Sequence, residues 1–329
     1  MDIIYTDKNF IEKGVLLNVS FDIEIGKYGT SENDFELTIS TNVRDVNFDE
    51  GSLFYIENTE FGGQVENKKV DTSKNTITFM GKTFRGMLEK EYVQPPNGSA
   101  YLILNGEANE ILNELISNRF GDLYEVENIG QSGIEVNYSV RDMNLLDAIE
   151  KSLWKSNARL EILFNNGKVR LQAKPIQDLS EIIQYDNSYG LSMIAETPKK
   201  AYNHILALGK GELTERLRVN LYKKKDGSWT TSSNTYFKGL ERKTYKYEDV
   251  NCDDTTELIN QAIDKVNELN GTEKLDISFT SDNAELFDIV GAKEEITGIS
   301  FKQQITQKIL KGSIYGDFEN TKISYKVGG

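Results

Sequence analysis

The chain has little of the residues that disulfides, zinc sites and many hydrolase sites need. Its 329 residues include one cysteine, Cys252, and one histidine, His204. A single cysteine excludes an intramolecular disulfide and a cysteine-rich zinc site. Only four prolines occur, and no tract is rich in Ser, Gly or Pro, so we expect no flexible linker and domains that are joined directly.

Basic residues are outnumbered by acidic ones. The chain has 38 Lys and Arg against 52 Asp and Glu, which gives a formal net charge of −14. This charge repels nucleic acid and anionic lipid, so stable binding to either is not expected. No apolar run approaches the roughly 18 residues of a membrane span, and the first residues, MDIIYTDKNF, lack the pattern of a secretion signal. We expect a protein made in the cytoplasm of its cell.

Alternating apolar residues predict β-strands in the first 95 residues. One face of the first strand carries Leu17, Val19, Phe21, Ile23 and Ile25. The same alternation over 35–39 predicts its antiparallel partner, with a turn over 26–33. Further strands are expected near 53–56, 63–70 and 76–80. We therefore predict a first small antiparallel β-barrel over 1–95, completed by strands near 175–200.

The pattern changes to helical spacing after Pro95 and Pro96. Apolar residues from Ala108 to Phe120 predict an amphipathic helix that stops at Gly121. A second helix is expected to begin after Asn144 as N-cap, with Asp147 in a capping-box-like position. A hairpin with an Asn166-Gly167 turn follows. Residues 96–174 are thus predicted to form an α+β module.

Strand patterns return in the last part of the chain. Residues 201–247 and 272–329 are predicted to form a second β-barrel, with a hairpin tip at Asp226-Gly227. A helical insertion over 248–271 is expected to begin after Asp254 as N-cap and to end at Gly271. The predicted fold class is α+β and mostly β, with two small barrels, a module between them and a helix inserted in the second barrel.

No motif of known chemistry is complete. Gly81-Lys82-Thr83 follows an apolar run as in a phosphate-binding loop, but Thr76 occupies the position of the required first glycine, so we expect Gly81 only to let a strand turn a corner. His204 lies in an apolar strand without a nucleophile motif, and Cys252 precedes a helix without a partner base. We therefore predict no catalytic, cofactor-binding or metal-binding residue.

Carboxylates are abundant, and they leave one enzyme class open. A cell-wall glycosidase needs only two carboxyl groups at about 5 to 10 Å, so it remains the enzymatic alternative. Asp22 and Glu24 fall on the polar face of a strand, while Asp253, Asp254 and Glu257 suit a helix N-terminus, and those structural roles are favoured. A carbohydrate- or receptor-binding protein is the third class, because 16 Tyr and 2 Trp could stack on sugars.

Four segments of the chain resemble the tail hub proteins of bacteriophages and prophages. They are FDIEIGKYGTSENDFELTIS, FGGQVENKKVDTSKNTITFMGKTFRGMLEKEYVQPPNG, NLLDAIEKSLWKSNARLEI and FDIVGAKEEITGISFKQQITQKI with the terminal ISYKVG. In such hubs a strand ending in Gly, an "RG-L" step and a proline pair lead out of the first barrel. Here Gly81, Arg85, Gly86, Leu88 and the pair Pro95-Pro96 fit that step.

The resemblance implies a structural virion protein without catalytic residues. Three copies would form the hub at the distal end of a phage or prophage tail, each giving two tube-like barrels to a six-fold-like ring, and the ring would leave a channel for DNA. The implied partners are a distal tail or tube protein above and a spike, fibre or tail-associated lysin below. The chain stops at Gly329, so we expect no peptidase or lysozyme-like domain on it. The inter-subunit interface is not predicted.

Overall fold

The computed structural model divides the chain into two compact units. It describes residues 1–29, 33–42, 48–180, 184–185, 192–195, 202–233, 237–270, 275–278, 284–293, 300–316 and 318–328. The first unit comprises 1–192 and 277–327, and the second comprises 193–276 with the last two residues. Strands outnumber helices among the described residues, so the prediction of a mostly β, α+β chain is confirmed at that level.

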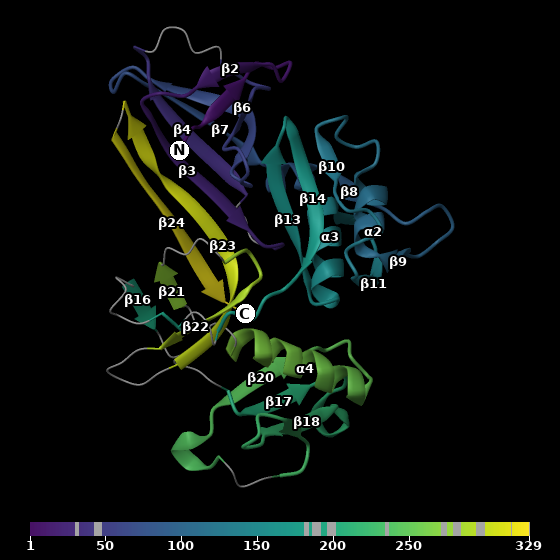
Figure 1. Cartoon of the computed structure of the whole chain (residues 1–329). Helices are drawn as coiled ribbons and strands as arrows, with labels where there is room; N and C mark the ends of the chain where they lie inside the picture. Colours follow the sequence, from purple (N-terminus) through teal and green to yellow (C-terminus); the bar gives the residue numbers. More distant parts are fainter. Residues whose placement is uncertain are drawn as a thin grey trace. The chain divides into compact units, whose positions relative to one another are not determined.

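The first unit is built on a long, mainly antiparallel sheet (Figure 1). Within this unit its strands follow the order β24-β23-β3-β4-β7-β6-β5-β1-β2. The alternation seen in the sequence is visible in β3, where Val19, Phe21 and Ile23 are buried. The bounds are β1 Ile4–Thr6, β2 Glu12–Val15, β3 Val19–Gly26, β4 Asp34–Ser40, β5 Leu53–Tyr55, β6 Gly62–Asp71, β7 Thr76–Thr83, β22 Ile289–Lys293, β23 Ser300–Tyr315 and β24 Phe318–Gly328.

The C-terminal strands group with the N-terminal ones, which differs from the predicted domains. We predicted that 272–329 would share a second barrel with 201–247. Instead β23 pairs with β3 from Gln307↔Gly26 to Ile314↔Val19, so these strands extend the first sheet. Sequence periodicity shows that a strand exists, but it does not identify the partner when that partner is nearly 300 residues away.

The two predicted barrels are not seen as closed rings. Among the described strands, the sheets follow open rows from one edge strand to another. Of the strands expected near 175–200, β15 (Gln184–Tyr185) pairs with β22, and β16 (Ser192–Ala195) follows it in the chain. Residues 181–183, 186–191 and 196–201 of this range lie outside the described residues.

The α+β module packs against this sheet within the same unit. Its helices α2 and α3 cover the three-stranded sheet β10-β14-β13, and one apolar core joins the module to Leu53 and Phe84 of the N-terminal strands (Figure 1). The bounds are α1 Phe84–Met87, the 3₁₀ turn η1 Leu88–Lys90, β8 Tyr92–Val93, β9 Leu102–Glu107, α2 Ala108–Ile116, β10 Tyr124–Val126, β11 Glu135–Val140, β12 Met143–Asn144, α3 Leu145–Lys155, β13 Ala158–Asn165 and β14 Lys168–Pro175.

The second unit is a four-stranded sheet with one helix. The strand order is β19-β18-β17-β20, and α4 packs on one face through Leu258, Ala262 and Val266. The bounds are β17 His204–Leu208, η3 Leu213–Glu215, β18 Arg218–Lys223, β19 Trp229–Thr230, η4 Gly239–Glu241, β20 Thr244–Glu248 and α4 Thr255–Asn270, followed in the chain by β21 Leu275–Ser278. The predicted helix is confirmed, while Gly271 lies outside the described residues.

Local signals in the sequence are confirmed where one side chain decides the structure. Asn144 Oδ1 accepts from Asp147 N at 2.8 Å and caps α3, and Asp254 Oδ1 accepts from Glu257 N at 2.8 Å before α4. Asn166 and Gly167 take positive φ angles of 52° and 75° at the β13–β14 turn. The two caps span only three residues and an Asn-Gly pair favours this turn locally, which is why these features could be predicted.

Three local predictions are wrong in detail. Gly81 does not turn a corner: it lies inside β7, where an added Cβ would stand 2.0 Å from Gln64 O, so its role is close backbone approach at a β-bulge. Leu17 is exposed, because Asn18 has a φ of 57° and β3 begins only at Val19. Helix α2 ends at Ile116 rather than near Gly121, and Asn118 already has a φ of 63°.

Candidate functional site

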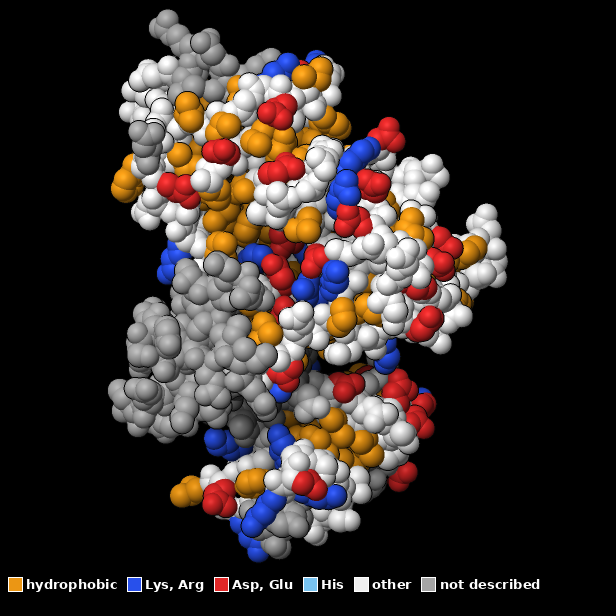
Figure 2. All heavy atoms as spheres, viewed as in Figure 1, with side chains coloured by type: hydrophobic (Ala, Val, Ile, Leu, Met, Phe, Trp, Pro, Cys, Tyr) orange, Lys and Arg blue, Asp and Glu red, His pale blue; other side chains and the backbone are white. Residues whose placement is uncertain are grey.

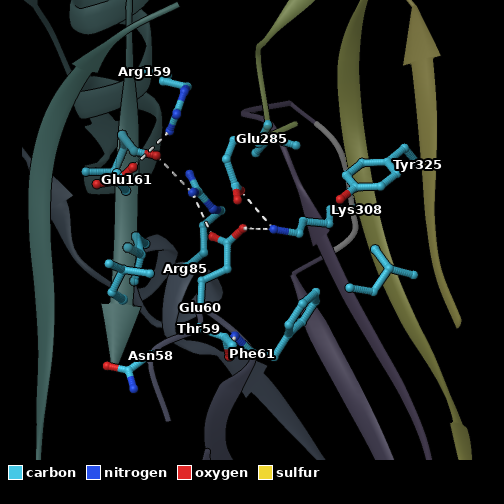
Figure 3. Close-up of a pocket in the computed structure, with 15 residues that line it drawn as sticks. Asn58, Thr59, Glu60, Phe61, Arg85, Arg159, Glu161, Glu285, Lys308 and Tyr325 are labelled. Carbon is cyan, nitrogen blue, oxygen red and sulfur yellow. Dashed lines mark hydrogen bonds and ion pairs between the residues drawn. The ribbon is translucent and has the colours of Figure 1, made fainter. Parts of the chain in front are cut away.

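A charged cavity lies within the first unit (Figure 3). Its volume is about 250 Å³. Charged residues from six separate parts of the chain line or adjoin it, namely Glu60, Arg85, Glu150, Arg159 with Glu161, Glu285 with Asp288, and Lys308. A cavity of this kind is where enzyme or ligand chemistry would first be sought.

Arg85 is the centre of the network. It stands in the short helix α1, which Thr83 caps by accepting from Gly86 N. Its Nη2 donates to Glu60 Oε2 at 3.0 Å and to Leu160 O at 3.1 Å, and its Nη1 donates to Glu150 Oε1. The side chain is 2% exposed. A buried guanidinium is stabilised only if its charge is neutralised in this way.

The glycine after Arg85 lets this turn approach the first sheet. A Cβ at Gly86 would lie 2.1 Å from Asn33 O, so no larger residue fits without moving the backbone. Asn33 in turn accepts from Gly26 N through its Oδ1 at 2.9 Å. Leu88, two residues on, is fully buried in the core shared with the module. Arg85, Gly86 and Leu88 therefore hold the end of β7 against both the first sheet and the α+β module.

Glu150 is an unusual carboxylate because its side chain is fully buried. It lies on the inner face of α3, accepts from Tyr28 N at 2.6 Å and pairs with Arg85. Burial raises the pKa of Glu150 to about 7, although the charge of Arg85 opposes this rise. The neighbouring carboxylates hold the pKa of Arg85 above its usual value despite its burial.

Two further cations complete the network. Lys308 Nζ lies 2.8 Å from Glu285 Oε2 and 3.9 Å from Glu60 Oε1, and Figure 3 shows it and Arg85 both directed toward Glu60. Arg159 Nε donates to Asp288 Oδ1 at 3.2 Å. Burial raises the pKa of Glu285, with Lys308 acting against it. Each of these acids thus faces a cation, and the pairs join segments that lie 23 to 129 residues apart in the chain.

This geometry favours structure over catalysis. A general acid must reach a substrate, but the side chain of Glu150 is 0% exposed and that of Glu60 is 6% exposed. The pairs connect the β5–β6 turn, α1, α3, β13, the 284–288 segment and β23. We interpret the network as a set of ion pairs that locks the module and the C-terminal strands onto the first sheet.

The residues considered from the sequence lie apart from this network. His204 is buried in β17, where its Nδ1 lies 2.9 Å from Thr244 Oγ1, and burial lowers its pKa. Cys252 is buried in the core under α4, with its Sγ against Asp254 O. Asp22 pairs with Lys311 and Asp253 pairs with Lys210 at 2.8 Å. The structure does not bring these residues together.

The network itself was not predicted from the sequence. One signal was present: Glu150 falls four residues after Leu146 and three before Leu153, so a carboxylate stands on the apolar face of a predicted helix. Its partner Arg85 follows Phe84 and precedes Met87 and Leu88. An isolated charge in an apolar pattern indicates a buried ion pair, but it does not say which residue is the partner.

Neither a metal-binding cluster nor a membrane-spanning helix is found in the described part of the chain. No group of three or more His, Cys, Asp or Glu is placed there to hold a metal ion. No helix there is long and apolar enough to cross a membrane.

Comparison with known proteins identifies relatives by fold. No family model matches the chain, and no curated protein is similar to it in sequence. It is similar to the prophage tail protein gp18 from Listeria monocytogenes EGD-e, with 14% identity, a TM-score of 0.54 and coverage of 100% of this chain and 94% of that one.

Two other tail proteins have the same fold over nearly their whole length. The tail protein from Neisseria meningitidis MC58 is 10% identical, with a TM-score of 0.52 and coverage of 100% of this chain and 96% of that one. The 43 kDa tail protein of prophage MuSo2 from Shewanella oneidensis is 9% identical, with a TM-score of 0.57 and coverage of 99% and 98%. The chain has the fold of phage and prophage tail proteins, as the resemblance of its four segments implied.

Proposed function

We propose that the chain is a structural, non-enzymatic protein of a phage or prophage tail. The observation that supports this most directly is the shared fold with three tail proteins over 99–100% of the chain. The buried network agrees with this proposal, because the carboxylates of Glu60 and Glu150 pair with Arg85 inside the first unit and do not face solvent. The protein would act in the virion tail after synthesis in the host cytoplasm.

More specifically, three copies would form the hub at the distal end of the tail. In this proposal each copy supplies two tube-like β units, so that six similar units face a hexameric tube above while three-fold symmetry is kept toward the tip below. A tube or distal tail protein would bind above, and a spike, fibre or tail-associated lysin below. The acidic composition suits a channel through which DNA passes without being held.

The test is the solution mass of the purified chain over a wide concentration range, with negative-stain images of the same samples. A mass of three copies, together with rings that have a central hole, supports the hub. A mass of one copy at every concentration, with no rings, contradicts it. Incubation with purified peptidoglycan is the companion assay, since hydrolysis that is lost on one Asp or Glu substitution would support the glycosidase alternative instead.

One observation favours carbohydrate binding as a second candidate. Trp154 at the end of α3 is 49% exposed and lines an open groove of about 550 Å³ with Asn157, Lys302 and Gln304. An exposed indole beside amide and ammonium donors is a surface on which a sugar ring can stack and form hydrogen bonds. Binding of cell-surface glycans that is lost in Trp154→Ala, but kept in Tyr92→Ala at another exposed aromatic residue, would support this function.

A further inference from the structure

The four-stranded sheet of the second unit has one face that α4 does not cover. Strand register places His204, Tyr222 and Thr244 side by side on this face. The next row combines Leu206, Asn220 and Lys246, and the third combines Leu208, Arg218 and Glu248. The opposite face, with Ile205, Ala207, Val219 and Leu221, is buried in the core with α4. We call the side away from α4 the open face; on its strand β17, His204 and Leu208 are only 8% exposed.

The open face is basic. Between residues 210 and 248 the sequence has ten Lys or Arg and five Asp or Glu. On the sheet itself Arg218 and Lys246 are exposed, and Lys246 Nζ lies 2.7 Å from Glu248 Oε2 on the same face. The Arg242 guanidinium lies over the Tyr222 ring at 5.6 Å. Figure 2 shows Lys and Arg side chains on the side of this unit away from α4, with some Asp and Glu among them, and further Asp and Glu near α4. The unit as a whole, 193–276, has 14 residues of each sign.

Two fully exposed leucines flank this basic surface. Leu240 is 103% exposed and Leu213 is 83% exposed. Each is held near the open face: Arg218 Nη2 donates to Leu213 O at 2.6 Å, and Asn203 Nδ2 donates to Glu241 O at 2.8 Å beside Leu240. Exposed apolar side chains around arginines are typical of protein interfaces, and they are not needed to hold a polyanion.

A surface of opposite charge lies on the first sheet. Residues 1–95 have 17 Asp and Glu against ten Lys and Arg. Asp22 on β3 lies directly opposite Glu36 on β4, an unfavourable pair of like charges that Lys311 on β23 offsets through its ion pair with Asp22. Asp34 and Glu36 are exposed and line an open hollow of about 240 Å³. This acidic surface consists of Asp22, Glu24, Asp34 and Glu36.

We propose that the open face of one copy docks on the acidic surface of a second copy; this rests on the assembly suggested under the proposed function. The opposite charges and the two flanking leucines favour this occupant. The two surfaces differ, so the contact is head-to-tail, and head-to-tail contacts close into a ring when the rotation permits. Around the ring, the second unit of each copy therefore contacts the first sheet of the next copy.

Charge reversal with light scattering at low and high salt tests the proposal. In R218E/K246E both changes are at exposed positions, and we expect self-association to weaken by ~10-fold or more at low salt, because like charges then face each other. The matched control K74E/K155E adds the same charge at other exposed sites and should associate like the unchanged chain. Adding Glu36→Lys to R218E/K246E should restore part of the association, while Glu36→Lys alone should weaken it.

Cross-linking locates the contact independently of affinity. A photoreactive side chain at Leu240, in a mixture of unlabelled and ¹⁵N-labelled full-length chains, should give peptides that join residue 240 of one copy to 19–40 of another. Cross-links within one copy only, or to other segments, would overturn the proposed contact. A three-copy ring that R218E/K246E leaves intact would overturn this inference alone, whereas a chain that stays monomeric throughout would contradict the proposed hub as well.

Discussion

Arg85 and Glu150 form a fully buried ion pair although 65 residues separate them in the chain. One belongs to the turn that leaves the first sheet and the other to helix α3 of the module. Glu60, which also bonds Arg85, adds the β5–β6 turn to the same group. The pair therefore fixes the module on the sheet, and removing either charge leaves the other buried without compensation.

We expect Arg85→Met to destabilise the first unit by about 3–5 kcal/mol, because Glu60 and Glu150 would then be buried without their shared cation. Chemical denaturation gives the free energy of unfolding. Arg141→Met is the matched control, since the Arg141 side chain is 62% exposed and its loss should cost about 0.5 kcal/mol or less. If R85M costs no more than R141M, the network does not fasten the layers.

The double variant R85M/E150Q separates loss of the pair from burial of an unpaired charge. It should be more stable than R85M alone, because the uncompensated Glu150 carboxylate is gone. If the loss of stability in R85M/E150Q equals the sum of the losses in R85M and E150Q, this explanation is contradicted.

The stability of the chain should depend on pH through Glu150. Its pKa is about 7 in the folded state against an ordinary 4.5, so the folded state binds this proton more tightly than the unfolded state. Protonated Glu150 stabilises the folded state fully below about pH 4.5. This stabilisation, about 3 kcal/mol in total, is lost as the pH rises through 7. The free energy of unfolding of the unchanged chain minus that of Glu150→Gln should fall over this window. A constant difference would show that Glu150 titrates normally.

Gly86→Ala should disrupt the turn around Arg85. The new Cβ would meet Asn33 O at 2.1 Å, and this oxygen is backbone, so the helix turn or the sheet must move. We expect a loss of about 1–3 kcal/mol or more. Gly98→Ala is the control: nothing lies within 4 Å of its Cβ, and only its φ of 86° opposes the change. Equal thermal stability of the two variants would contradict the close approach at Gly86.

The parts of this fold that could be predicted from the sequence are those decided by neighbouring residues. Asn144 and Asp254 cap helices through bonds that span three residues, and Asn166-Gly167 takes the positive φ angles that this residue pair favours. The pairing of β23 with β3 could not be predicted in this way, because many alternating strands present equivalent edges. The same limit applies to side chains. The partners of Arg85, namely Glu60 and Glu150, are brought to it only by the folded structure, so the sequence alone does not identify them.

The most direct test of the proposed hub is electron cryo-microscopy of the assembled full chain, viewed along the particle axis. We predict three copies around a central hole, with six β units of similar size in the ring and three-fold symmetry in the averaged projections. Particles without a hole, or a copy number that is not a multiple of three, would contradict the hub.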